Sequence, residues 1–137
     1  FYNLVPNLTV KENIQVCQYL TKNPLDLEEL LQVLGLTEHQ NKFPAQLSGG
    51  QQQRCAIARA LINEPKILLA DEPTGNLDSN NAWEIMKLLD EINKRGTTVL
   101  VVSHNMEIVE AMKKRVITLQ QGHVVSDVKM GGDEDEN

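Results

Sequence analysis

K-I-L-L-A-D-E-P-T-G-N-L-D, at residues 66–78, is the stretch on which the interpretation of the whole chain depends. Its apolar run at 67–70 is followed at once by two carboxylates, Asp71 and Glu72. A short apolar run bounded by turn residues predicts a strand buried on both faces. One acid at the carboxyl end of such a strand can hold Mg²⁺, and the other can orient or deprotonate a water. An ordinary polar strand end is the alternative interpretation.

A second stretch, L-S-G-G-Q-Q-Q-R at residues 47–54, leads into a sequence that favours a helix. Ser48, Gly49 and Gly50 are therefore predicted at a helix N-terminus, where free N–H groups and the helix dipole favour an anion. Glycine also lets the backbone approach a phosphate closely. The alternative interpretation is an ordinary serine N-cap followed by a flexible glycine pair. It explains where the helix starts, but not why two glycines, which lower helix stability, stand there.

The residues after the carboxylates predict a strand–helix–strand unit. Asp78 or Ser79 should cap a helix over 81–95, and Gly96 should end it. The β-branched run at 97–103 then predicts a second strand that ends at His104. Because such units are right-handed with parallel strands, both strand ends open on one edge. We therefore expect Asp71, Glu72 and His104 to converge there.

Local signals divide the remaining sequence into helices and a hairpin. A capping box at Thr9 predicts a helix over 10–20, and Asp26 begins a second helix that Gly35 ends. A third, short helix is predicted over 37–40, so the first 45 residues read as helical. Past a helix over 106–113, strands at 116–119 and 123–125 are predicted to form a hairpin around Gly122.

Composition bounds the class of protein. The 137 residues suffice for one domain or part of one, with 41% apolar but only 4% aromatic residues, so the core should be aliphatic. Of the net charge of −6, the four acids at 133–136 carry −4, and no basic patch suited to nucleic acid remains. The two cysteines, Cys17 and Cys55, form no metal or redox motif. The sequence has no run of 18 consecutive apolar residues, and we do not expect its first residues, F-Y-N-L-V-P, to act as a signal peptide.

Four motifs together resemble the ATP-binding cassette (ABC) ATPases, the nucleotide-binding subunits of ABC transporters. L-S-G-G-Q at 47–51 resembles that family's signature motif, and I-L-L-A-D-E-P at 67–73 its Walker B strand with the following glutamate. G-N-L-D at 75–78 resembles the D-loop, and His104 the switch histidine. Order and spacing agree as well. The strings S-G-G-Q-Q-Q-R and A-D-E-P-T-G-N-L-D most resemble the exporter branch of the family.

The resemblance implies a role for each matching residue. Asp71 would hold Mg²⁺, Glu72 would be the general base, and His104 would contact the γ-phosphate of ATP. Asp78 would link the two active sites of a dimer. The signature residues would bind the ATP held by a partner subunit; they are Leu47, Ser48, Gly49, Gly50 and Gln51. The family further implies a head-to-tail dimer beneath integral-membrane permease subunits, on the cytoplasmic face of the cell membrane.

The sequence departs from the family in one respect. It contains no G-x-x-x-x-G-K-[S/T], the loop that cradles ATP phosphates. The first ten residues resemble those just after the family's Q-loop glutamine, so we expect this chain to be the C-terminal part of a nucleotide-binding domain. We therefore predict a partial P-loop NTPase fold of the α/β class: a parallel sheet flanked by helices, an N-terminal helical subdomain and a small C-terminal hairpin.

We divide this predicted fold into a helical subdomain at 1–50, an ATPase core at 51–128 and an acidic disordered tail at 129–137. Two other functions stay open. A degenerate, non-hydrolysing cassette could serve only as a docking module, although Glu72 and His104 are intact. A DNA-repair ABC ATPase would share the motifs, but the coiled coils and zinc motifs usual there are absent from the sequence. The transported substrate cannot be read from these residues.

Overall fold

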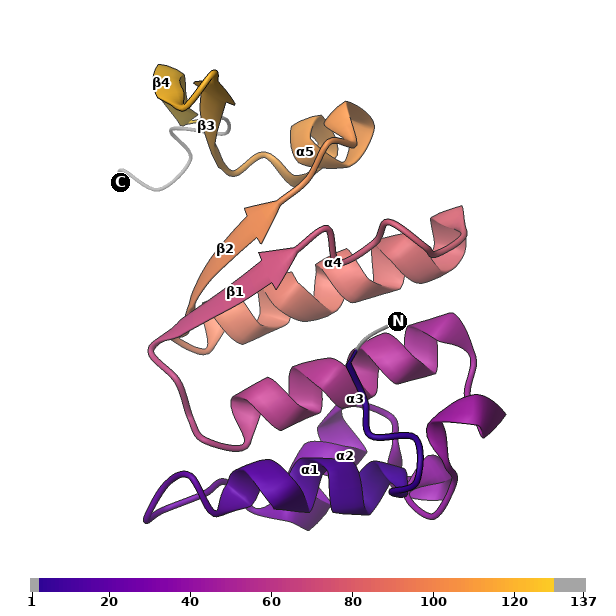
Figure 1. Cartoon of the computed structure of the whole chain (residues 1–137). Helices are drawn as coiled ribbons and strands as arrows, with labels where there is room; N and C mark the ends of the chain where they lie inside the picture. Colours follow the sequence, from indigo (N-terminus) through magenta and orange to yellow (C-terminus); the bar gives the residue numbers. More distant parts are fainter. Residues whose placement is uncertain (1–2, 130–137) are drawn as a thin grey trace, which may run out of the picture. The chain divides into compact units, whose positions relative to one another are not determined.

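The computed structural model describes residues 3–129 (Figure 1). Contacts divide the chain into two compact units, Phe1–Val102 and Ser103–Asn137, and each is described by itself. The elements of the first unit are, in order, α1 (Val10–Gln18), α2 (Leu27–Val33), the 3₁₀ turns η1 (Thr37–His39) and η2 (Pro44–Gln46), α3 (Gly49–Leu61), β1 (Ile67–Asp71), α4 (Ser79–Lys94) and β2 (Thr98–Val102). Those of the second are α5 (Met106–Met112), β3 (Arg115–Gln120) and β4 (His123–Lys129).

The helices begin where their capping residues predicted. Thr9 and Ser48 each form a complete capping box, and Asp26 accepts hydrogen bonds from two backbone N–H groups of α2. Of the two candidates for α4, Asp78 is the N-cap and Ser79 the first helical residue. The C-terminal ends of α2 and α4 are likewise set by nearby residues. Gly35 and Gly96, which follow these helices, adopt the positive φ that only glycine takes freely. These predictions are confirmed to within two residues at each boundary.

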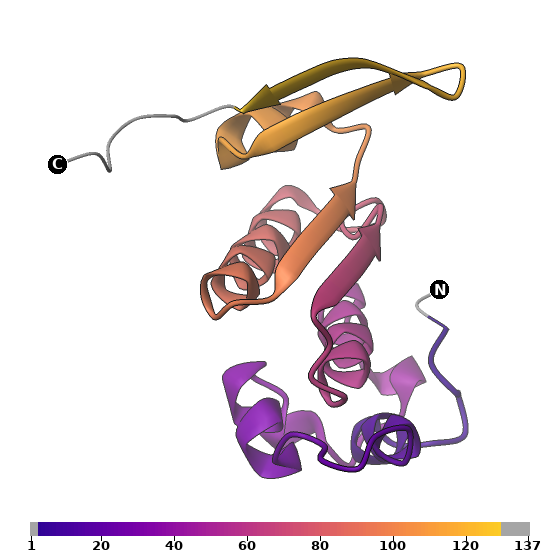
Figure 2. The same ribbon diagram turned by 90° about the vertical axis from the view of Figure 1, so that its left-hand side faces the viewer.

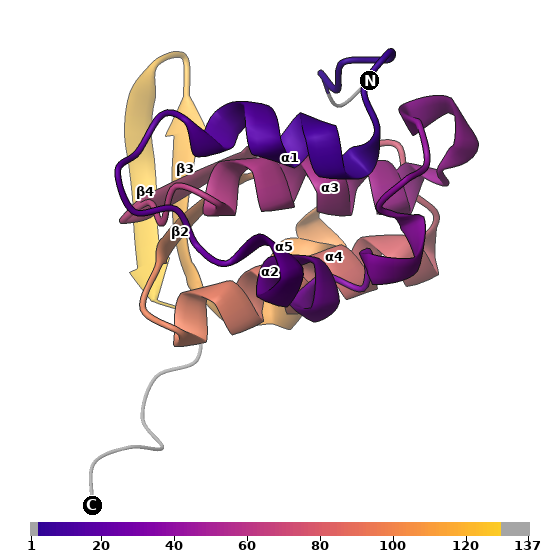
Figure 3. The same ribbon diagram turned by 90° about the horizontal axis from the view of Figure 1, so that it is seen from below.

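An aliphatic core holds the helical part of the first unit together. Helices α1 and α3 lie side by side (Figures 1 and 3), and Val10, Ile14 and Cys55 are completely buried. Burial raises the pKa of the Cys55 thiol to about 11. Asn13 is buried as well, and its side chain accepts from the N–H of Val5 at 2.8 Å and donates to three carbonyl groups. The Asn13 side chain therefore fixes the segment before α1. No local pattern in the sequence predicts this role.

Strands β1 and β2 form the predicted parallel pair (Figure 2). Their register places Asp71 opposite Val102. The prediction of burial on both faces is wrong. Leu68 is buried and lines a cavity with residues of α3 and α4, whereas Leu69 is 70% exposed and Leu100 52% exposed. Alternate residues of a strand point to opposite faces, and within the described part of the first unit helices cover only one of them.

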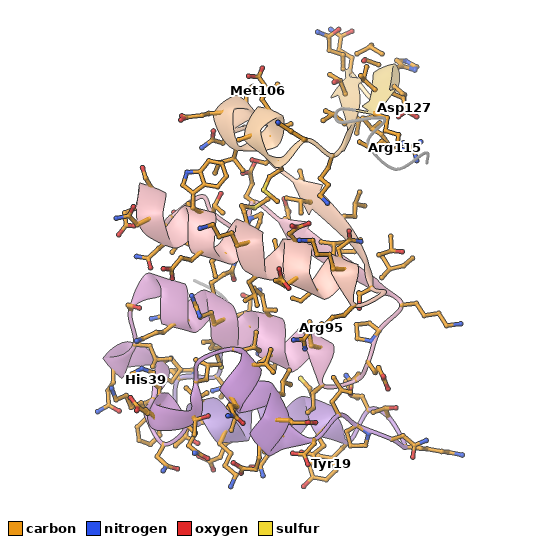
Figure 4. The ribbon with its side chains drawn as sticks, turned by 180° about the vertical axis from the view of Figure 1, so that it is seen from behind. Tyr19, His39, Arg95, Met106, Arg115 and Asp127 are labelled. Atoms are coloured by element: carbon orange, nitrogen blue, oxygen red, sulfur yellow. The ribbon has the colours of Figure 1, made fainter. Side chains whose placement is uncertain are left out.

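The second unit carries the predicted hairpin. Strands β3 and β4 pair antiparallel around Gln121 and Gly122, whose φ values of 48° and 78° suit a tight two-residue turn. Arg115 donates two hydrogen bonds across the pair to Asp127, at 2.8 and 2.6 Å, and the two side chains lie together in Figure 4. Lys129, expected to open the acidic tail, is the last residue of β4; 130–137 lie outside the described residues.

Across residues 3–129, no helix combines the length and the apolar character that crossing a bilayer requires.

Candidate nucleotide site

The turn after β1 is shaped by the backbone of Glu72. Its N–H donates to the carbonyl of Val102 at 2.8 Å, which extends the β1–β2 pairing by one residue, and its carbonyl accepts from the N–H of Gly75 at 3.2 Å. Its φ of 47° lies in the left-handed region, which costs a non-glycine residue about 1–3 kcal/mol. Such strain persists only where surrounding contacts fix it, and it is concentrated at functional sites. The two neighbouring acids therefore differ: Asp71 is exposed at the end of the strand, whereas Glu72 is half-buried in a left-handed turn.

Asp78 lies six residues after Glu72, at the start of α4. Its Oδ1 accepts from the backbone N–H of Asn81 at 2.9 Å, and its Oδ2 accepts from the Asn81 side-chain amide at 2.9 Å. These two donors, the backbone N–H first, hold the pKa of Asp78 below its usual range. Asp78 therefore stays a solvent-exposed carboxylate at the head of α4.

At the start of α3, Ser48 and Gln51 close a reciprocal capping box. The Ser48 Oγ accepts from the N–H of Gln51 at 3.2 Å, and the Gln51 Oε1 accepts from the N–H of Ser48 at 3.0 Å. Gly49 is exposed there. The side chain of Leu47 is buried, so a ligand contact from this residue would have to use its backbone.

Gly50 has a different reason to be glycine. It is buried, and a Cβ added to it would stand 3.1 Å from the Oδ1 of Asn81. The starts of α3 and α4 thus approach each other through Asn81, the residue that is hydrogen-bonded to Asp78. The structure therefore brings the predicted signature and D-loop residues of one chain together, a proximity that the sequence alone did not reveal.

The residues after the signature connect α3 to four different segments, and sequence reasoning missed this role. Gln52 donates to the carbonyl of Pro44 at 2.9 Å, and Gln53 donates to the carbonyl of Pro73 at 2.7 Å. Arg54 donates to the carbonyl of Leu34 and forms an ion pair of 2.8 Å with Glu84. Of these bonds, Gln53–Pro73 joins α3 to the turn of Asp71 and Glu72. The only signal in the sequence was the run of three glutamines itself.

A cavity of about 380 Å³ lies beside that turn, within the first unit. Its polar edge includes Asp71, Glu72 and Gln53, and its apolar floor comes from α3, β1 and Leu89 of α4. His104 follows β2 by two residues but belongs to the second unit, so its convergence with the two carboxylates stays a prediction.

The donor chemistry at the end of β1 fits a magnesium ion. Residues 3–129 hold no cluster of three or more His, Cys, Asp or Glu side chains arranged around a metal position. Mg²⁺ does not require one, because it is usually bound by one or two carboxylates together with phosphate oxygens and waters. The exposed Asp71 can supply that single carboxylate beside the cavity.

The sequence has relatives among known proteins. The family described as ABC transporter matches residues 1–75. The chain is 48% identical over 135 residues to the cell division ATP-binding protein FtsE of Streptococcus pneumoniae, covering 95% of this chain and 59% of that protein. It is 45% identical over 129 residues to the macrolide export ATP-binding/permease protein MacB of Shigella flexneri (90% and 20%). It is 43% identical over 130 residues to the methionine import ATP-binding protein MetN of Haemophilus ducreyi (90% and 38%).

The fold has a solved counterpart. The dimeric structure of a post-hydrolysis state of the ATP-binding cassette MJ0796, bound to ADP and Pi, matches with a TM-score of 0.79 at 39% identity. The match covers 96% of this chain and 61% of that one, and it confirms the predicted fold class. The chain spans less than two thirds of the length of each of these proteins.

Proposed function

Because the chain belongs to the ABC transporter family and matches part of an ATP-binding domain, we propose that the natural protein carrying it binds and hydrolyses ATP as a subunit of an exporter. One observation supports the proposal of ATP hydrolysis. A strained Glu72 follows Asp71 at the carboxyl end of a parallel strand, beside a cavity, and Gln53 ties this turn to α3. A turn maintained at such a cost suits a position where a carboxylate must be placed accurately.

The roles follow from the chemistry of each group. Asp71 would hold Mg²⁺, which neutralises phosphate charge when bound. Glu72 would orient or deprotonate the attacking water, and His104 would donate to the γ-phosphate. The N–H groups of Gly49 and Gly50 at the start of α3 would take a γ-phosphate, since those of Ser48 and Gln51 are already bonded within the capping box. The residues proposed there are Leu47, Ser48, Gly49, Gly50 and Gln51, with Asp78 beside them at the start of α4.

The partners are part of the same proposal. We propose a head-to-tail homodimer in which the start of α3 completes the partner's ATP site, docked on permease subunits at the cytoplasmic face of a membrane. Residues 1–50 would form the docking subdomain and 51–128 the ATPase core, with the boundary inside α3. Transport outward is supported by the likeness to MacB, whereas the likeness to MetN, an import protein by name, keeps the direction a proposal.

A magnesium titration of ATP hydrolysis tests the function. The natural protein, purified with its membrane partners, should hydrolyse ATP, and Asp71→Asn should raise the Mg²⁺ concentration needed for half-maximal activity several-fold. Glu110→Gln, an exposed change on α5, is the control and should not alter the Mg²⁺ dependence. Hydrolysis that is absent from the wild type, or a Mg²⁺ dependence equal in Asp71→Asn and wild type, would contradict the proposal.

The 137-residue chain by itself gives the complementary measurement. It contains no G-x-x-x-x-G-K-[S/T], so its backbone and lysines lack the loop that cradles ATP phosphates. Calorimetric titration with Mg-ATP should therefore show at best millimolar binding and no hydrolysis. Micromolar binding would mean that the site forms without that loop.

A further inference from the structure

His39 contacts the side chain of a signature residue from outside the signature itself. Its Nε2 lies 3.2 Å from the Nε2 of Gln51, and Figure 4 labels His39 on the loop between α2 and α3. We propose that His39 is a positioning residue, which orients the Gln51 amide and so keeps the first turn of α3 ready for a phosphate. The effect on ATP use rests on the function proposed above, whereas the contact and its protonation state do not.

The hydrogen-bond network decides which atom of the contact donates. The Gln51 Oε1 accepts from the N–H of Ser48 at 3.0 Å, so the other end of the amide is its NH₂ group, a donor only. A donor facing the His39 Nε2 requires an acceptor there. We therefore assign Nε2 as the acceptor of this contact, which places the ring proton on Nδ1. This assignment follows from the backbone N–H, since flipping the amide would place its NH₂ against another donor.

The backbone around His39 is itself held in place. The N–H of His39 donates to Leu36 at 2.9 Å, and its carbonyl accepts from the N–H of Lys42 at 3.0 Å. The same loop receives the start of α1, because the N–H groups of Val10 and Lys11 donate to its carbonyls at 2.9 Å each. The Nδ1 atom of His39 is buried and has no hydrogen-bond partner within the described residues. The loop that carries His39 is thus anchored on both sides, which keeps the imidazole beside Gln51.

Loss of that acceptor should loosen the cap. Gln51 serves two contacts at once, since its Oε1 holds the Ser48 N–H while its NH₂ holds His39. Without an acceptor at the position of Nε2, the amide can rotate and exchange its backbone bond for water. The N–H groups at the start of α3 would then be less well ordered when a phosphate arrives, which lowers affinity through the cost of ordering them.

The tautomer is the direct test. Long-range ¹H–¹⁵N NMR of the natural protein with ¹⁵N-labelled histidine separates the two neutral tautomers, and the signals that vanish in His39→Gln belong to His39. We expect the Nδ1–H form at neutral pH. The exposed His123 on β4 serves as the reference ring. An Nε2–H form or a doubly protonated ring at His39 would overturn the proposal, whatever the enzyme does.

A matched pair of variants tests the consequence. Gln can place an acceptor near the position of the imidazole Nε2, whereas Met has similar length and none. We expect His39→Met to lower kcat/KM for ATP about threefold to tenfold, from the net value of one hydrogen bond, and His39→Gln to stay within about twofold of wild type. His123→Met is the control. Equal losses in His39→Met and His39→Gln would show a structural role only, and a wild type without hydrolysis would refute the proposed function while leaving the tautomer test intact.

Discussion

The start of α3 and the turn after β1 are built in opposite ways. At the start of α3, side chains define the geometry, because Gln51, Gln52 and Gln53 each hydrogen-bond a different segment. At the turn after β1, the backbone defines it, through the left-handed Glu72 and its bond to Val102. The first region is a surface fixed by many partners, and the second is one strained residue fixed by the sheet.

The difference fits the role proposed for each region. An anion site made of backbone N–H groups needs an ordered helix end. Several side-chain hydrogen bonds, each weak, can together provide that order. A general base has to project from one defined point, so a strained backbone is tolerated there. Gln53, at 2.7 Å from the carbonyl of Pro73, is the bond that joins the two regions.

The largest expected effect comes from removing the base. In the natural protein, Glu72→Gln should slow hydrolysis about 10²–10⁴-fold, since an amide cannot accept the proton of water. Affinity for Mg-ATP should persist, because the substitution leaves Asp71 in place. Steady-state hydrolysis and nucleotide binding would be measured side by side, with Glu110→Gln as control. Hydrolysis within about threefold of wild type would remove Glu72 from the role proposed here.

The next effect should appear at the start of α3. Gly49→Asp places a carboxylate on an exposed residue at the proposed phosphate position, and like charges there should cost the ATP-bound dimer several kcal/mol. Gly49→Asn is the matched control, equal in size but uncharged, and should cost much less. Dimerisation would be followed by sedimentation in a Glu72→Gln background. If Gly49→Asp weakens ATP binding by the monomer as much as it weakens dimerisation, α3 binds its own nucleotide and the head-to-tail arrangement fails.

Cutting the bond between the two regions should have a moderate effect. Gln53→Met keeps the side-chain length but removes the donor to the carbonyl of Pro73. The loss of this hydrogen bond should lower the free energy of unfolding by about 0.5–1.5 kcal/mol. If the bond positions Glu72, the loss falls mainly on kcat. Gln32→Met, an exposed change on α2, should alter neither kcat nor KM. A Gln53→Met enzyme with unchanged kcat and a lower Tm would show that the two regions are coupled for stability only.

The smallest effect concerns the charge of Asp78. Its folded pKa is lowered, so the stability it contributes is present above the pKa of the unfolded chain and is lost as the pH falls through the folded pKa. Asn is an equally good helix cap, so Asp78→Asn keeps the bond from the Asn81 backbone N–H, while it removes the charge and the acceptor of the Asn81 side-chain amide. We expect a slightly lower Tm than wild type at pH 7 and no difference at a pH below the folded pKa. A Tm difference that stays constant with pH would assign the effect to packing.

Much of this architecture could be predicted from the sequence because its signals are local. Ser48 and Asp78 hydrogen-bond backbone groups three residues away, so each cap identifies its helix without knowledge of the rest of the chain. The apolar run before Asp71 likewise places a strand end there. What the local pattern could not decide is how many faces of β1 are covered, because that depends on which elements pack against it.

The sequence by itself determined where the helices begin and end, and which stretches carry carboxylates and a glycine-rich helix start. It ended the last strand at residue 125, whereas β4 runs to Lys129. Only the tertiary structure decided that Gln51 meets His39, that Gln53 meets Pro73, and that Gly50 lies against Asn81. The reason is physical. A cap is satisfied within one turn of chain, whereas each of these contacts joins residues 12 to 31 positions apart and exists only once the helices have packed.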